Sequence, residues 1–109
     1  MKIKDAKVYT LSDIATAAQA KVQAAFPNID PIIGISHNLR ESGFAADTMT
    51  IQNHKTDKRI LLVLHDEAPD TVDVEFGKIS KDPTFQFETY NLQDMTEELF
   101  VDWMSESLT

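Results

Sequence analysis

An unbroken run of branched apolar residues at positions 60–64, Ile-Leu-Leu-Val-Leu, constrains the fold more than any other feature of the chain. A run of this kind is typical of a central strand that is covered on both faces. Residues 66–70 have turn composition and include Pro69, which cannot donate a hydrogen bond to a strand ladder. Residues 71–76 alternate polar and apolar side chains, as a strand with one buried face does. The sequence therefore predicts a central hairpin.

Amphipathic helices are predicted on both sides of this hairpin. Residues 11–26 carry apolar side chains at helical spacing, with Thr10 as the expected N-cap and Pro27 just beyond the end. Near the C-terminus, Asn91 is the expected cap of a helix with the apolar stripe Leu92, Met95, Leu99, Phe100, Trp103 and Met104.

Residues 31–42 are predicted as a second N-terminal helix, because Asp30 and Pro31 resemble a cap and first turn and Gly43 a stop. The β-branched isoleucines and Gly34 leave a strand over residues 32–36 as the alternative. Residues 1–9 are expected to form an edge strand or an ordered arm.

Two further strands complete the predicted fold. Residues 47–53 alternate and lead through a polar loop into the central strand, and residues 84–90 alternate after a turn-rich segment. The prediction is an α+β fold with a four-stranded antiparallel meander, two N-terminal helices and one C-terminal helix packed on it. We expect residues 1–109 to form a single compact domain, because a chain of 109 residues with 42% hydrophobic content suits one core.

Composition restricts the classes of partner. The 10 basic and 18 acidic side chains give a net charge of −8, which repels nucleic acids and anionic membranes and favours a basic protein partner. The acids are concentrated late in the chain: residues 1–61 sum to +2 and residues 62–109 to −10. Solubility alone is a sufficient explanation for such charge. The charged N-terminus, the lack of a long apolar run and the absence of cysteine predict a cytoplasmic protein without disulfides.

No motif assigns catalytic, cofactor-binding or metal-binding residues. The three histidines lie in different predicted elements, without the spacing of a metal site. His65 is followed by Asp66, Glu67 and Asp70, which could join it in a site, although a half-exposed histidine beside an acidic turn explains the same pattern.

The segment around His37 offers a weaker signal. Ser36 precedes His37, but the pattern of a nucleophile elbow is not completed. On the predicted helix, His37, Arg40 and Glu41 share one face, which forms either a small recognition patch or an ordinary exposed surface.

The predicted sheet has one core face and one face of mixed character. We expect the core face to carry Ile60, Leu62, Leu64, Val72, Val74, Phe76, Phe85 and Phe87. The opposite face is then apolar at its centre and acidic around it, and its predicted partner-binding residues are Leu61, Val63, Asp73, Glu75, Glu88 and Tyr90. Cover by the chain itself is the structural alternative.

Two functional hypotheses follow. The first is a small non-enzymatic binding protein, of an inhibitor, immunity or chaperone type, that engages a basic protein or a second copy of itself through this face. The second is a small enzyme or ligand-binding or metal-binding module that uses His65 with Asp66, Glu67 or Asp70.

Overall fold

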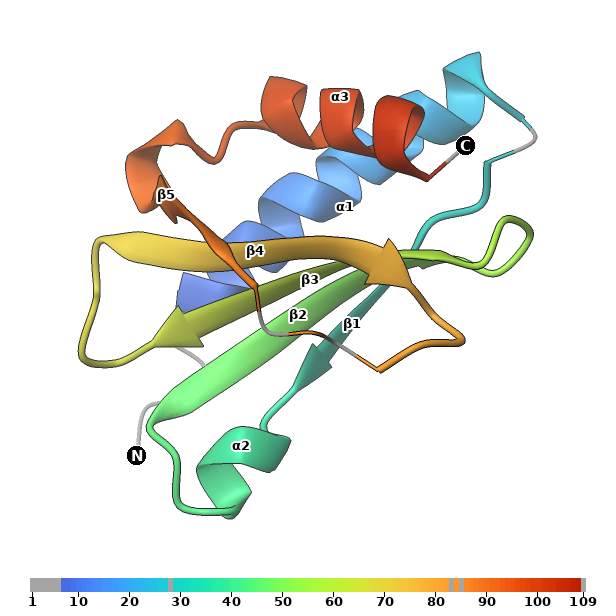
Figure 1. Ribbon diagram of the computed structural model, residues 1–109. Helices are drawn as coiled ribbons and strands as arrows, with labels where there is room; N and C mark the ends of the chain where they lie inside the picture. The colour runs from blue at the N-terminus through green and yellow to red at the C-terminus, as the bar shows by residue number, and fades with distance from the viewer. Residues whose placement is uncertain (1–6, 28, 83, 85, 109) are drawn as a thin grey trace.

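The computed structural model describes residues 7–27, 29–82, 84 and 86–108. It shows an α+β fold built on one antiparallel sheet (Figure 1). The sheet has five strands in the order β1-β2-β3-β4-β5, one more than predicted. In chain order the elements are α1 (Lys7–Ala25), β1 (Ile32–Ser36), α2 (Asn38–Glu41), β2 (Ala46–Asn53), β3 (Lys58–His65), β4 (Thr71–Lys78), β5 (Glu88–Asn91), the 3-10 turn η2 (Leu92–Asp94) and α3 (Glu97–Ser107).

The predicted central hairpin is present, with β3 in the middle of the sheet. Leu62 lies opposite Met49 of β2 and Val74 of β4, so these three side chains share one face. Figure 1 shows α1 and α3 together over this face, which we call the helix face. Its core is formed by fully buried residues from both helices and three strands, among them Leu11, Val22, Met49, Ile51, Ile60, Leu62, Val72, Val74, Phe100 and Met104.

The predicted helix over residues 31–42 is wrong, and the strand alternative holds for its first part. Ile32–Ser36 is β1, which pairs antiparallel with β2, and only Asn38–Glu41 is helical. The physical reason is that β-branched isoleucines and Gly34 are poor helix formers, while Ile33 and Ile35 gain packing against the core as a strand. Gly43 follows α2 with φ of +98°, the left-handed conformation that the predicted stop requires.

The chain termini also differ from prediction. The first helix is confirmed but starts at Lys7, so Thr10 lies inside it and is no cap. The predicted edge strand or arm is therefore wrong for residues 7–9, which are helical, and residues 1–6 lie outside the described residues. The last helix begins at Glu97, because the hydroxyl of Thr96 accepts a hydrogen bond from the amide of Leu99. Asn91, the predicted cap, instead pairs with Thr71 in the sheet.

The strand predicted at residues 84–90 is shorter and later, Glu88–Asn91, and its residues face the other way. Glu88 lies opposite Val74 and Tyr90 opposite Val72, so both are on the helix face, and the Tyr90 ring meets Trp103 edge-on at 5.3 Å. Phe87, predicted in the main core, packs with a small cluster on the opposite side of the sheet. Phe85 lies outside the described residues.

The side of the sheet away from α1 and α3, here called the far face, carries Ala46, Leu61, Val63, Asp73 and Glu75 at its centre. Leu39 of α2 and Phe87 pack against its apolar cluster. The segment after β4 is fixed there by Glu75, whose carboxylate accepts hydrogen bonds from the amide and hydroxyl of Thr84 at 2.9 and 3.0 Å. The chain therefore covers the centre of this face itself.

Candidate functional site

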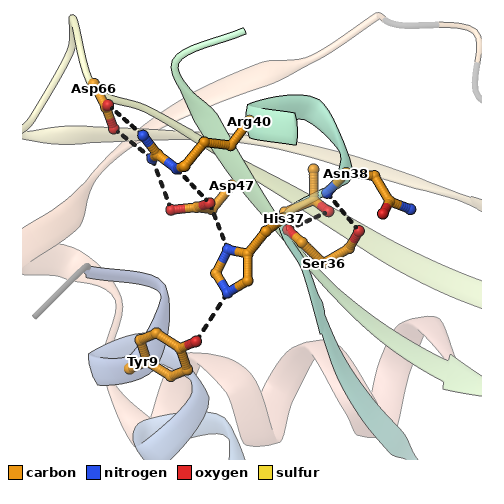
Figure 2. A network of polar contacts seen from close by, with 8 residues as sticks. Tyr9, Ser36, His37, Asn38, Arg40, Asp47 and Asp66 are labelled. Atoms are coloured by element: carbon orange, nitrogen blue, oxygen red, sulfur yellow. Dashed lines mark hydrogen bonds and ion pairs between the residues drawn. The ribbon is translucent and has the colours of Figure 1, made fainter. Parts of the chain in front are cut away.

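A chain of polar contacts at one end of the sheet links side chains from four parts of the fold (Figure 2). Tyr9 comes from α1, Asp47 from β2 and Asp66 from the turn after β3, while His37 and Arg40 lie at α2. Figure 2 shows the imidazole of His37 between Tyr9 and Asp47, and the guanidinium of Arg40 between Asp47 and Asp66. We call these five residues the polar network.

Asp47 is the centre of the polar network. Its side chain is only 4% exposed, and one carboxylate oxygen lies 2.7 Å from His37 Nδ1. The same carboxylate accepts hydrogen bonds from Nε and Nη2 of Arg40 at 3.1 and 2.9 Å. Burying a carboxylate costs free energy unless the group is paired. The donors from His37 and Arg40 therefore compensate for the burial of Asp47 at this end of the sheet.

Arg40 also binds Asp66 through two parallel hydrogen bonds of 2.8 and 2.9 Å. This fork geometry matches a guanidinium to a carboxylate and fixes the turn after β3 against α2. Hydrogen bonding to Arg40 lowers the pKa of Asp66, and the same guanidinium, helped by His37, lowers the pKa of Asp47 against the opposing effect of burial. The two carboxylates in turn raise the pKa of Arg40.

The Asp47, His37 and Tyr9 side chains form a carboxylate, imidazole and hydroxyl series. The Tyr9 hydroxyl lies 2.8 Å from His37 Nε2. With Asp47 ionised, neutral His37 carries its proton on Nδ1 and accepts from the Tyr9 hydroxyl at Nε2. Such a series can pass a proton, but both imidazole nitrogens already have partners within the chain. Its evident role is to tie α1 and α2 to β2.

Sequence reasoning grouped His37, Arg40 and Glu41, and the structure unites the first two around Asp47. Glu41 is exposed. Asp47 was missed because it was predicted on a strand while Arg40 and His37, 7 and 10 residues away, were predicted on a helix, and no local pattern pairs side chains from two different elements. The observable hint was a lone acid in a strand otherwise made of Thr, Met, Ile, Gln and Asn.

A shallow cavity of about 240 Å³ opens at the same end of the sheet, on the far face. It is lined by Leu39, Phe44, Ala45, Ala46, His65 and Glu67. Phe44 is 62% exposed, the most exposed of the large hydrophobic side chains described. An exposed aromatic ring beside an apolar cavity has an unfavourable solvation free energy in the isolated chain. Such a position is typical of an interaction site.

The predicted group around His65 is only partly brought together. His65 and Glu67 line this cavity, and His65 Nε2 lies 3.3 Å from the carboxylate of Asp73. Asp66 binds Arg40 instead. Asp70 lies at a separate hollow of about 420 Å³ lined with Asn91, Leu92 and Gln93.

The residues predicted to bind a partner are dispersed. Leu61 and Val63 are on the far face as expected but only 9% and 5% exposed. Glu75 is 8% exposed and binds Thr84. Asp73 stays half-buried on this face, where it accepts a hydrogen bond from Thr89. The placement of Glu88 and Tyr90 there was wrong, since both lie on the helix face.

Among the described residues, no group of three or more histidines and acids is arranged to hold a metal ion. The helices of this part of the chain are too short or too polar to cross a membrane. Comparisons with protein families, with curated proteins and with solved structures find no match to this chain.

Proposed function

We propose that this chain is a small non-enzymatic binding protein that engages a basic protein partner at the cavity end of the far face. The observation that carries the proposal is Phe44, an aromatic side chain that is 62% exposed at the mouth of an apolar cavity. Exposed aromatic residues next to a pocket are characteristic anchors of protein interfaces. The absence of cysteine suits a reducing compartment such as the cytoplasm.

The charge around the cavity supports a basic partner. Glu67 lines the cavity, and Asp73 contacts another cavity residue, His65. Both acids belong to residues 62–109, whose charges sum to −10. A partner that inserts an apolar side chain beside Phe44 and places lysine or arginine near these acids would have both packing and charge complementarity.

The test is capture of partners from native extract with immobilised protein, at low and at high salt. We expect a basic protein to bind at low salt and to be released as salt screens the charges. Phe44→Ala and Glu67→Lys should each abolish its capture. The control is Phe26→Ala, because Phe26 is also exposed, at 45%, but follows the end of α1. Equal capture by the Phe44 and Phe26 variants would refute this site.

The second candidate is a small enzyme or ligand-binding module centred on His65. The observation in its favour is that His65 and Glu67 line one cavity, with Asp73 against the imidazole. A bound ligand would raise the melting temperature by mass action. Screening small carboxylates, amines and divalent cations against the wild type and His65→Gln separates the candidates. A ligand that stabilises only the wild type, with no protein captured, favours the second.

A further inference from the structure

The edge strand β1 lacks the features that usually prevent edge strands from pairing. It reads Ile-Ile-Gly-Ile-Ser, without a charged residue, and no described segment pairs with its outer side. Folded proteins normally protect such an edge with lysine, an inward charge, a bulge or a covering segment. Ile32 is moreover 48% exposed on the far face. The outward backbone groups of β1 therefore have no strand partner among the described residues, and the edge also carries apolar surface.

The neighbourhood of β1 on the far face is also uncharged. The β2 residues opposite it there are Gln52, Thr50 and Thr48. Because the meander places the strands in chain order, β4 and β5, which belong to the half of the chain that sums to −10, lie on the side of the sheet away from β1, whereas α3 packs on α1 above the helix face. A second copy that approaches through β1 thus keeps the acidic strands of the two copies on opposite outer sides of the pair, where their repulsion is weakest.

The sequence of β1 is self-complementary about its middle residue. With a two-fold axis at Gly34, antiparallel pairing places Ile33 opposite Ile35 of the other copy, on the helix face. On the far face it places Ile32 opposite Ser36, with Gly34 facing its own counterpart. Pairs of β-branched residues stabilise adjacent strands, and no like charges oppose each other in this register.

From the uncharged edge and this register, we propose that two copies of the chain associate through β1 to form one continuous ten-stranded antiparallel sheet. This interface is separate from the cavity and does not depend on the proposed basic partner. Association buries the exposed side chain of Ile32 and satisfies the outward amide and carbonyl groups of the edge.

The decisive experiment is sedimentation of the intact protein over a roughly 100-fold range of concentration, where mass action separates monomer from dimer. The first variant carries Ile32→Glu and Ser36→Glu, which sets two pairs of like charges directly opposite each other. The second carries Ile32→Lys and Ser36→Glu, which sets opposite charges in the same places. Both contain Ser36→Glu, so they share any effect of losing the hydrogen bond from the Asn38 amide to Ser36 Oγ.

We expect the wild type to dimerise, the first variant to bind itself roughly tenfold or more weakly, and the second to recover dimerisation. Circular dichroism should be the same for all three. A wild type that remains monomeric throughout, or equal association of the two variants, overturns the proposal. If the first variant does not fold, hydrogen exchange of the wild type decides: amides of alternate β1 residues must become protected as concentration rises, and concentration-independent exchange refutes the interface.

Discussion

Replacing Asp47 with asparagine tests the role of the polar network in stability. The side chain of Asp47 is 4% exposed and accepts hydrogen bonds from His37 and Arg40 through three nitrogen donors. Asparagine has nearly the same shape, but it has one acceptor oxygen, and its amide group would face a donor. The substitution therefore removes the negative charge and leaves one or two hydrogen bonds unmade without opening a cavity.

The expected loss follows from these contacts. A hydrogen bond to a charged group contributes about 1.5 to 3 kcal/mol, so Asp47→Asn should lower the free energy of unfolding by about 2 to 4 kcal/mol at pH 7. A domain of this kind has about 5 to 15 kcal/mol in total, so the variant should still fold. The control is Asp94→Asn, which removes the same charge from an exposed position.

The loss should also depend on pH. Arg40 lowers the pKa of Asp47 in the folded state below its unfolded value of about 3.9. A lowered folded-state pKa stabilises the fold fully above the unfolded value, and this stabilisation disappears as pH falls through the folded value. The difference between wild type and variant should therefore be constant near neutrality and shrink below about pH 4.

Urea unfolding at several pH values, followed by fluorescence of the single tryptophan, Trp103, measures both effects. Trp103 is suitable because its ring contacts Phe76, Tyr90 and Phe100 at centroid distances of 5.3 to 5.6 Å. Equal unfolding midpoints for Asp47→Asn and Asp94→Asn at pH 7 would show that the network contributes no net stability. A difference that stayed unchanged into acid would show that ionisation of Asp47 is not its source.

Three further substitutions test the fold by the same unfolding measurement. Leu62→Ala should lower the free energy of unfolding by about 2 to 5 kcal/mol, because Leu62 is fully buried in the main core. An unchanged unfolding midpoint would contradict the placement of Leu62 in that core. Gly43→Ala should cost about 1 to 2 kcal/mol through its positive φ alone, since a Cβ there meets nothing within 4 Å; Gly77→Ala, without positive φ, is the matched control and should be nearly neutral. Thr96→Ala should lower the free energy of unfolding by about 1 kcal/mol by removing the N-cap of α3, whereas Thr16→Ala, at an exposed position of α1, should not lower it.

The elements predicted correctly are those whose sequence patterns are long or unbroken. The apolar run at residues 60–64 became β3, and the stripe of residues 11–26 became most of α1. The β1 strand was misassigned because Ile32, Ile35 and Leu39 also fit helical spacing. The isoleucines and Gly34 favoured a strand locally, but pairing with β2, a tertiary contact, decided its conformation.

The faces of β5 were misassigned because the core side of the predicted strand was chosen from its apolar residues, with Phe87 placed in the core. The register with β4 instead puts Glu88 and Tyr90 opposite Val74 and Val72, on the helix face. The polar network was missed for a related reason. Asp66 lies 26 residues from Arg40, and only the fold of the hairpin and α2 brings their side chains together. The cavity beside Phe44 likewise depends on how α2 lies across the sheet.

The meander order gives the uneven charge of the sequence a spatial meaning. In a fold with crossover connections, residues 1–61 and 62–109 would interleave, and sums of +2 and −10 would predict little about the surface. Here consecutive strands are neighbours, so the boundary between the two halves falls within β3, at the centre of the sheet. The outer side of β1 then borders the nearly neutral half, while β4, β5 and α3 belong to the acidic half. Self-association through β1 therefore avoids repulsion between the acidic halves. The same acids, among them Glu67 and Asp73, remain able to attract a basic partner.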